Sequence, residues 1–215
     1  MKNLLNKELK LAASPLSFIF VAFAAMTLIP GYPILLGSFF VCLGIFQSFQ
    51  TVRENNDILY TVLLPADKGD AVRAKYVFVC FIEIVAWLLM AALTALRMTK
   101  LADAAAYVSN PLMDANLVYL AFAAVVFALF NTVFLGGFFR TAYKFGMPFV
   151  FFIVAAMVVV GIAEVLHHVP GLDFLNGNNA LGVQAAILAA GIVIYALATW
   201  ASCRVSRRRF ELLDL

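Results

Sequence analysis

The stretch TVRENNDILYTVLLPADKGDAVRAKY, residues 51–76, is a polar segment set between two long apolar runs. It carries eight of the chain's 27 charged residues, namely Arg53, Glu54, Asp57, Asp67, Lys68, Asp70, Arg73 and Lys75. Its apolar residues Ile58, Leu59, Val62 and Leu63 have the i, i+1, i+4, i+5 spacing of one helix face. A turn between two membrane helices needs only a few residues. The segment therefore predicts a structured surface that meets a partner in the aqueous phase.

The composition around this segment is that of an integral membrane protein. The chain is 65% hydrophobic and 13% charged, whereas soluble domains are about 45–50% apolar and about 25% charged. With about 20 apolar residues per spanning helix, 215 residues suffice for six spans in one permease domain, 1–215, and leave no room for a soluble catalytic domain. The net charge of +3 does not indicate a nucleic-acid partner, because the basic residues sort by membrane side.

Six apolar runs are expected to be membrane-spanning helices, giving an all-α integral membrane protein. They cover residues 14–29, 33–50, 74–96, 115–138, 146–166 and 181–203. Each can cross a core of about 30 Å at about 1.5 Å per residue, the first only just. The runs lack the two-residue alternation of membrane β-barrel strands. Small residues at Gly182, Ala186 and Ala190 would let the last helix approach a neighbour closely.

The first residues favour a short amphipathic helix in the membrane interface, within 1–13. Leu5 and Leu9 are four apart, and Lys2, Lys7 and Lys10 supply the polar character; a frayed basic tail is the alternative. These lysines and the small residues at 22–24 also resemble a signal peptide. However, the apolar run continues to Ile29, so we expect a retained span.

The basic residues predict the orientation of the chain. Thirteen of the 15 lie before the first span, in the 2–3 and 4–5 loops, or after the last span, and only Arg97 and Lys100 lie on the other side. The positive-inside rule then places both termini and residues 51–76 in the cytoplasm. The expected location is a bacterial cytoplasmic membrane, with the chain crossing it several times.

Residues 51–76 themselves read as a helix, a break and a second helix. Pro65 cannot continue a helix and biases the residue before it away from helical dihedrals. A helix over about 54–63 would end there. Asp67 or Asp70 would then cap the helix that becomes the third span, because Asp is favoured at helix starts.

Ionisable residues in the apolar runs are candidates for chemistry. Glu83 lies about two turns into the third span, where a carboxylate is costly and marks a pathway, a proton site or an inter-helix pair. Glu164, His167 and His168 contain one Glu-x-x-His pair, but bundle metal sites use two. We expect a polar helix end there and no metal site. The chain contains no G-x-x-x-x-G-K-[ST] loop, so ATP would bind another polypeptide.

The segment between the second and third spans resembles that of the ABC-2 type permeases. In that family an acidic stretch leads to a Leu-Leu-Pro or Ser-Leu-Pro turn, polar residues, and a Lys-Tyr that opens the third helix. The corresponding residues here are Glu54, Asp57, Leu63-Leu64-Pro65, Asp67-Lys68 and Lys75-Tyr76. Ala66 departs from the Ser or Thr often found after the proline. The outline of the whole chain is also similar to small stand-alone permeases such as the phenol-soluble modulin exporters.

The resemblance implies the membrane half of an ABC exporter, working as a homodimer with separate ATPase subunits that carry ATP and Mg. The segment 51–75 would hold a coupling helix seated in the ATPase, with Glu54, Asp57, Ile58, Leu59, Val62, Leu63 and Pro65 at the contact. Glu83 would lie on the translocation pathway. The cargo would be an amphipathic, peptide or lipid-like molecule. The chain itself would not be an enzyme and would hold no cofactor.

Two alternatives stay open at this point. The first is an intramembrane enzyme, a metal- or glutamate-dependent hydrolase that uses Glu83 or the Glu164/His167/His168 group. The second is the substrate-binding membrane subunit of an ATP-driven importer. The long 2–3 loop argues against the importer, because such subunits need not contact the ATPase.

Overall fold

The computed structural model describes residues 2–8, 10, 13–56, 60–61, 67–108, 110–141, 144–177 and 180–213, and every regular element in these ranges is helical. Four helical runs in them are long and apolar enough to cross a membrane. They are α5 (Lys68–Thr99), the continuous run of α7 (Leu117–Leu129), η3 (Phe130–Leu135) and α8 (Gly136–Phe138), α9 (Gly146–His168), and α10 (Leu181–Glu211). An all-helical membrane protein is therefore confirmed.

The first two expected spans fall on shorter or more polar helices. Residues 14–29 form α2 (Pro15–Ile19) and then η2 (Phe20–Leu28), a nine-residue 3₁₀ helix. Ser14 caps α2 by accepting from the backbone N–H of Leu16. Residues 33–50 fall in α3 (Leu36–Glu54). The six-span arrangement stays a prediction. Short elements are α1 (Lys2–Lys7), α6 (Ala105–Val108) and η4 (Asp173–Leu175).

Two spans are longer than their apolar runs. α5 begins at Lys68 rather than near residue 74, and Asp67 is its N-cap, as predicted, although the Asp67 side chain makes no capping hydrogen bond. α10 continues through its basic stretch to Glu211. Helical hydrogen bonding does not stop where the apolar composition stops, because charged residues such as Lys and Arg are good helix formers.

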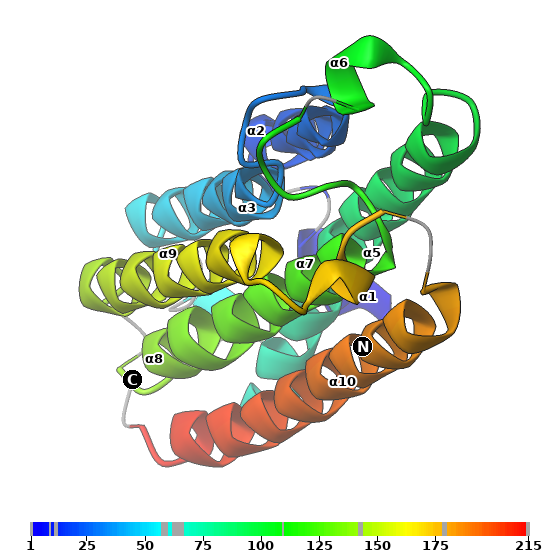
Figure 1. Cartoon of the computed structure of the whole chain (residues 1–215). Coiled ribbons are helices and arrows are strands. Elements are labelled where there is room, and N and C mark those ends of the chain that lie inside the picture. Colours follow the sequence, from blue (N-terminus) through cyan, green and yellow to red (C-terminus); the bar gives the residue numbers. More distant parts are fainter. Residues whose placement is uncertain are drawn as a thin grey trace.

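The helices pack as a bundle in which α7 is the most enclosed. Figure 1 shows α3, α9, the α7–η3–α8 run and α10 lying side by side, with α5 behind them. Stacked and edge-on phenylalanines fill the space between α3, the α7–η3–α8 run and α9. Their rings are those of Phe46, Phe49, Phe130, Phe134, Phe138, Phe149 and Phe152. We call the end where α3 and α10 finish and α5 begins the basic end, and the opposite end the Arg97 end.

α10 contacts α7 through one glycine. A Cβ atom added at Gly191 would lie 2.9 Å from the Ala121 Cα and carbonyl oxygen. The prediction that Gly182, Ala186 and Ala190 form the close contact is wrong within this chain, because all three are exposed. The packed face of α10 is set instead by Gln184, Gly191, Ser206 and Phe210, its buried residues.

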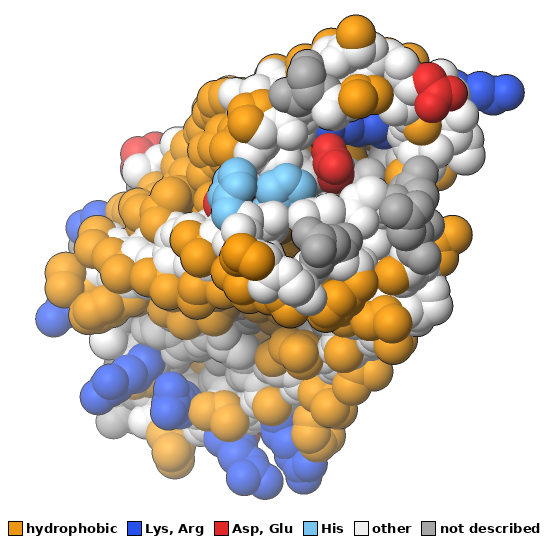
Figure 2. Space-filling view, viewed as in Figure 1, with side chains coloured by type: hydrophobic (Ala, Val, Ile, Leu, Met, Phe, Trp, Pro, Cys, Tyr) orange, Lys and Arg blue, Asp and Glu red, His pale blue; other side chains and the backbone are white. Residues whose placement is uncertain are grey.

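The outer faces of α9 and α10 are covered by apolar side chains. Figure 2 shows this hydrophobic surface, with basic side chains gathered toward the end of the molecule where α10 finishes. Exposed residues on these helices include Phe151, Val154, Val158, Ile194, Leu197 and Trp200. Such faces are stable when lipid covers them, which fits a membrane protein.

Candidate functional site

The predicted coupling segment begins differently from our expectation. A helix was expected over about 54–63, but Glu54 is the last residue of α3 and is exposed. Asn55 and Asn56 form a turn, with Asn56 in the left-handed region at φ 51°, and Tyr60 and Thr61 are helical. Asn tolerates this conformation better than most residues, which explains the break after Glu54. The predicted contact residues Asp57, Ile58, Leu59, Val62, Leu63 and Pro65 lie outside the described residues.

The N-terminal helix joins this segment to α5. The Lys7 Nζ donates a hydrogen bond to the Thr61 hydroxyl. The Glu8 carboxylate, directly after α1, accepts from the Lys75 Nζ at 2.6 Å, and these residues are only 3% and 5% exposed. We expected residues 1–13 to lie in the membrane interface. In addition, α1 packs against α5 through a buried ion pair.

The end of α10 lies against the start of α5. The Lys68 Nζ donates to the carbonyl of Leu213 at 2.8 Å, and Arg207 lies 3.8 Å from Asp67 and 3.7 Å from Glu211. The first turn of α5 therefore contacts both the N-terminal and the C-terminal parts of the chain. A displacement of the preceding polar segment would reach α5, α1 and α10 together.

Glu83 is the centre of a buried polar cluster inside the bundle. Its Oε2 accepts from the Asn131 Nδ2 and from the Tyr195 hydroxyl, both at 2.8 Å. Asn131 also donates to the Thr199 hydroxyl at 3.0 Å. Glu83 is fully buried, and its Oε1 has no hydrogen-bond partner among the described residues. The cluster joins α5, η3 and α10, so the inter-helix contact raised as one reading of Glu83 is present.

A second set of hydroxyls continues from this cluster toward the basic end. Asn131 lies in η3, a π-helical segment, and such segments occur frequently at functional sites. Its backbone carbonyl accepts from the Ser202 hydroxyl at 2.6 Å and from the Tyr76 hydroxyl at 3.3 Å. Tyr76 also lies 2.9 Å from the Ser206 hydroxyl. Polar contacts between α5, η3 and α10 thus extend from Glu83 to the last turns of α10.

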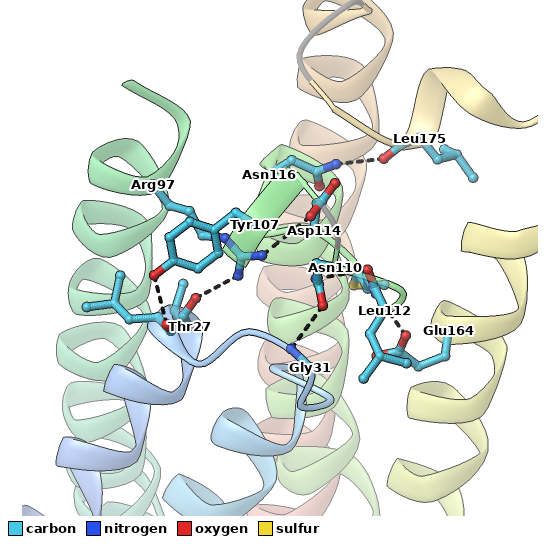
Figure 3. A network of polar contacts seen from close by, with 12 residues as sticks. Thr27, Gly31, Arg97, Tyr107, Asn110, Leu112, Asp114, Asn116, Glu164 and Leu175 are labelled. Carbon is cyan, nitrogen blue, oxygen red and sulfur yellow. Dashed lines mark hydrogen bonds and ion pairs between the residues drawn. The ribbon is translucent and has the colours of Figure 1, made fainter. Parts of the chain in front are cut away.

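Arg97 organises the opposite end, as Figure 3 shows. This buried guanidinium donates to the carbonyl of Thr27 at 2.9 Å, at the end of η2, and pairs with Asp114 at 3.4 Å. It also lies 4.4 Å from the centre of the Tyr107 ring, whose hydroxyl donates to Leu28. These contacts hold the loop between α5 and α7 over the ends of both helices.

The predicted metal candidates have other partners. The Glu164 Oε2 accepts from the backbone N–H of Met113 at 3.0 Å (Figure 3). The rings of His167 and His168 are 5.3 Å apart and nearly perpendicular. Within the part of the chain that the structure describes, no three His, Cys, Asp or Glu side chains come together to hold a metal ion.

Several residues of these clusters were missed from the sequence. Asn131 and Tyr195 stand among apolar neighbours in their spans, and a lone polar residue in a span is a signal that could have marked them. Arg97 was counted only as an orientation charge. The Glu8–Lys75 pair has no sequence signal, because its members are 67 residues apart.

Comparison with known proteins gives one match. A family model described as ABC-2 family transporter protein matches residues 3–210. No curated protein and no solved structure matches the chain.

Proposed function

Because the chain belongs to the ABC-2 family of transporter proteins, we propose that it is the permease subunit of an ATP-driven exporter. Family membership makes it a membrane component of a transporter. The proposal adds a separate ATPase partner that binds ATP and Mg, a second permease copy, and export of an amphipathic, peptide or lipid-like cargo. It also places both termini and the basic end in the cytoplasm of a bacterial cell.

The observation that carries the proposal is the set of contacts at the basic end. The polar segment after Glu54 is linked to α1 through Lys7 and Thr61, and α1 is linked to α5 through Glu8 and Lys75. A soluble ATPase that moves this segment would therefore act on two helical elements at once. Since α5 also carries Glu83, the movement would reach the polar cluster inside the bundle.

The proposed coupling surface includes Glu54, Asp57, the apolar stripe over Ile58 to Leu63, and Pro65. An apolar patch with charged residues around it suits a protein–protein contact, since the apolar part supplies burial and the charges set the register. Neither alternative function is supported by family membership. For the enzyme alternative in particular, Glu83 and Glu164 lie on different helices and have separate partners.

The test is to purify the chain with its ATPase and to measure ATP hydrolysis after reconstitution. The double substitution Glu54→Ala with Leu59→Asp should reduce ATP hydrolysis to the level of the ATPase alone, because it places a charge in the apolar contact. A matched pair at the Arg97 end, Asp103→Ala with Leu101→Asp, should keep the permease-dependent rate. If the first pair retains the full rate with folded spans, residues 54–65 do not couple the two proteins.

A further inference from the structure

A cavity of about 250 Å³ lies between α5, α7 and α10, beside the Glu83 cluster. Aromatic rings of Trp87, Phe127 and Tyr195 form part of its lining, and Glu83 contributes to the same wall. Ligand pockets are typically about 300–1,000 Å³. This cavity therefore suits one end of an elongated molecule better than a whole folded cargo.

The cavity can be reached from the hydrocarbon core of the membrane. Its remaining wall includes Ile84 and Leu88 of α5 and Ile192 of α10, which are 49%, 57% and 43% exposed on the outer surface of the bundle. Exposed apolar residues on spanning helices face lipid. An alkyl chain could therefore remain in the bilayer while its head group enters between α5 and α10.

The charge of the cavity wall is unusual for its surroundings. Glu83 is completely buried and, among the described residues, no Lys, Arg or His forms an ion pair with it. Its Oε2 has two donors, whereas its Oε1 has none. Burying a carboxylate without a cation and with an unpaired oxygen is costly. The titratable groups near it are uncharged in their ordinary forms: Tyr195 of α10, Cys80 of α5 and Cys42 of α3.

From these observations we propose that the cavity binds the ammonium group of an amphipathic amine that enters from the bilayer. Glu83 supplies the counter-charge, and its unpaired Oε1 accepts a hydrogen bond from the ammonium. Trp87, Phe127 and Tyr195 present aromatic surfaces, which attract cations. The Trp87 ring is fixed for this purpose, because its Nε1 donates to the carbonyl of Leu120 at 3.0 Å. The inference rests on the proposed function in naming this amine as a class of cargo.

The chain offers a direct optical assay of binding. It has two tryptophans, Trp87 in the cavity wall and Trp200, which is 61% exposed on the outer face of α10. Trp200→Phe leaves Trp87 as the single reporter. This variant, in nanodiscs of zwitterionic lipid and without any ATPase, is titrated with octylamine and with octanol, which match in chain length and differ in charge. Octylamine should produce a saturable change in Trp87 fluorescence, with an affinity about tenfold or more above that of octanol.

Three variants in this background decide the role of the carboxylate. Glu83→Gln should remove the preference for the amine while octanol still binds. Glu164→Gln alters a carboxylate at the far end of α9 and should keep the preference. Ala124→Leu fills the cavity from α7 and should weaken both ligands, provided that the thermal transition remains that of the parent.

Equal affinity for octylamine and octanol in the parent would overturn the proposal. So would an unchanged preference in Glu83→Gln. Because the titration contains no ATPase, either result would leave the coupling proposal intact. Conversely, loss of coupling in the ATPase assay would leave the binding result standing, so the two failures are distinguishable.

Discussion

Replacing Lys75 by Met tests the buried ion pair between Glu8 and Lys75. The substitution preserves the length of the side chain and its packing against Phe49, but leaves the Glu8 carboxylate without its 2.6 Å partner at 3% exposure. Removing one partner of a buried ion pair costs about 3–5 kcal/mol, because the remaining charge is uncompensated. α1 can limit this cost by detaching and returning Glu8 to water. We therefore expect the variant to lose the docked state of α1 before the bundle unfolds.

The assay is a double-mutant cycle read by two measurements. Lys75→Met, Glu8→Gln and the combined variant are compared with the parent for thermal unfolding in detergent and for protease cleavage within residues 1–13. Each single variant should be cleaved faster than the parent. The combined variant should recover much of the loss, since replacing both charges removes the uncompensated one. An exposed lysine, Lys100→Met, is the control and should behave as the parent.

The salt dependence gives the sharpest contradiction. A pair this buried is screened little by ions, so raising the salt concentration to 1 M should leave the difference between parent and Lys75→Met unchanged. If salt abolishes the difference, or if the four variants have additive effects, the pair is an exposed contact worth little. The link from α1 to α5 would then fail as a carrier of motion.

Two further substitutions test the packing at other levels of the bundle. Gly191→Leu should lower the thermal transition in detergent by separating α10 from α7, at a cost of about 1–3 kcal/mol or more, whereas Gly182→Leu, which meets open space, should not; equal effects would contradict the close contact. Arg97→Met should cost about 1–3 kcal/mol, because the carbonyl of Thr27 loses its donor, and should speed protease cleavage in residues 101–116; unaltered cleavage would show that Arg97 does not hold this loop.

Much of the fold could be predicted because lipid imposes a simple rule on composition. The apolar runs located every long helix, and the turn at Pro30-Gly31 marks the end of the first run. Their boundaries were less predictable. α5 and α10 continue into charged residues, since hydropathy marks contact with lipid and does not mark hydrogen bonding. Conversely, Glu54 ends a helix that the apolar stripe after it suggested it would start.

The internal site was harder to predict, because pairing is a tertiary property. Glu83 stood out as a carboxylate in a span, but its partners Asn131 and Tyr195 come from helices 48 and 112 residues away. The close contact at Gly191 shows the same limit. Small residues are common along this chain, and only the position of α7 decides which of them is buried.

The 3₁₀ helix η2 gives the first apolar segment an adjustable length. At about 2.0 Å per residue its nine residues extend about 18 Å, against about 13.5 Å if they were α-helical. The fourteen residues of α2 and η2 together then reach about 25 Å, close to the thickness of the hydrocarbon core. Conversion between the two helix types would change the reach of this segment by about 4.5 Å. Differences of a few ångströms also separate cell membranes from one another, so this segment could follow the local bilayer thickness without changing its tilt.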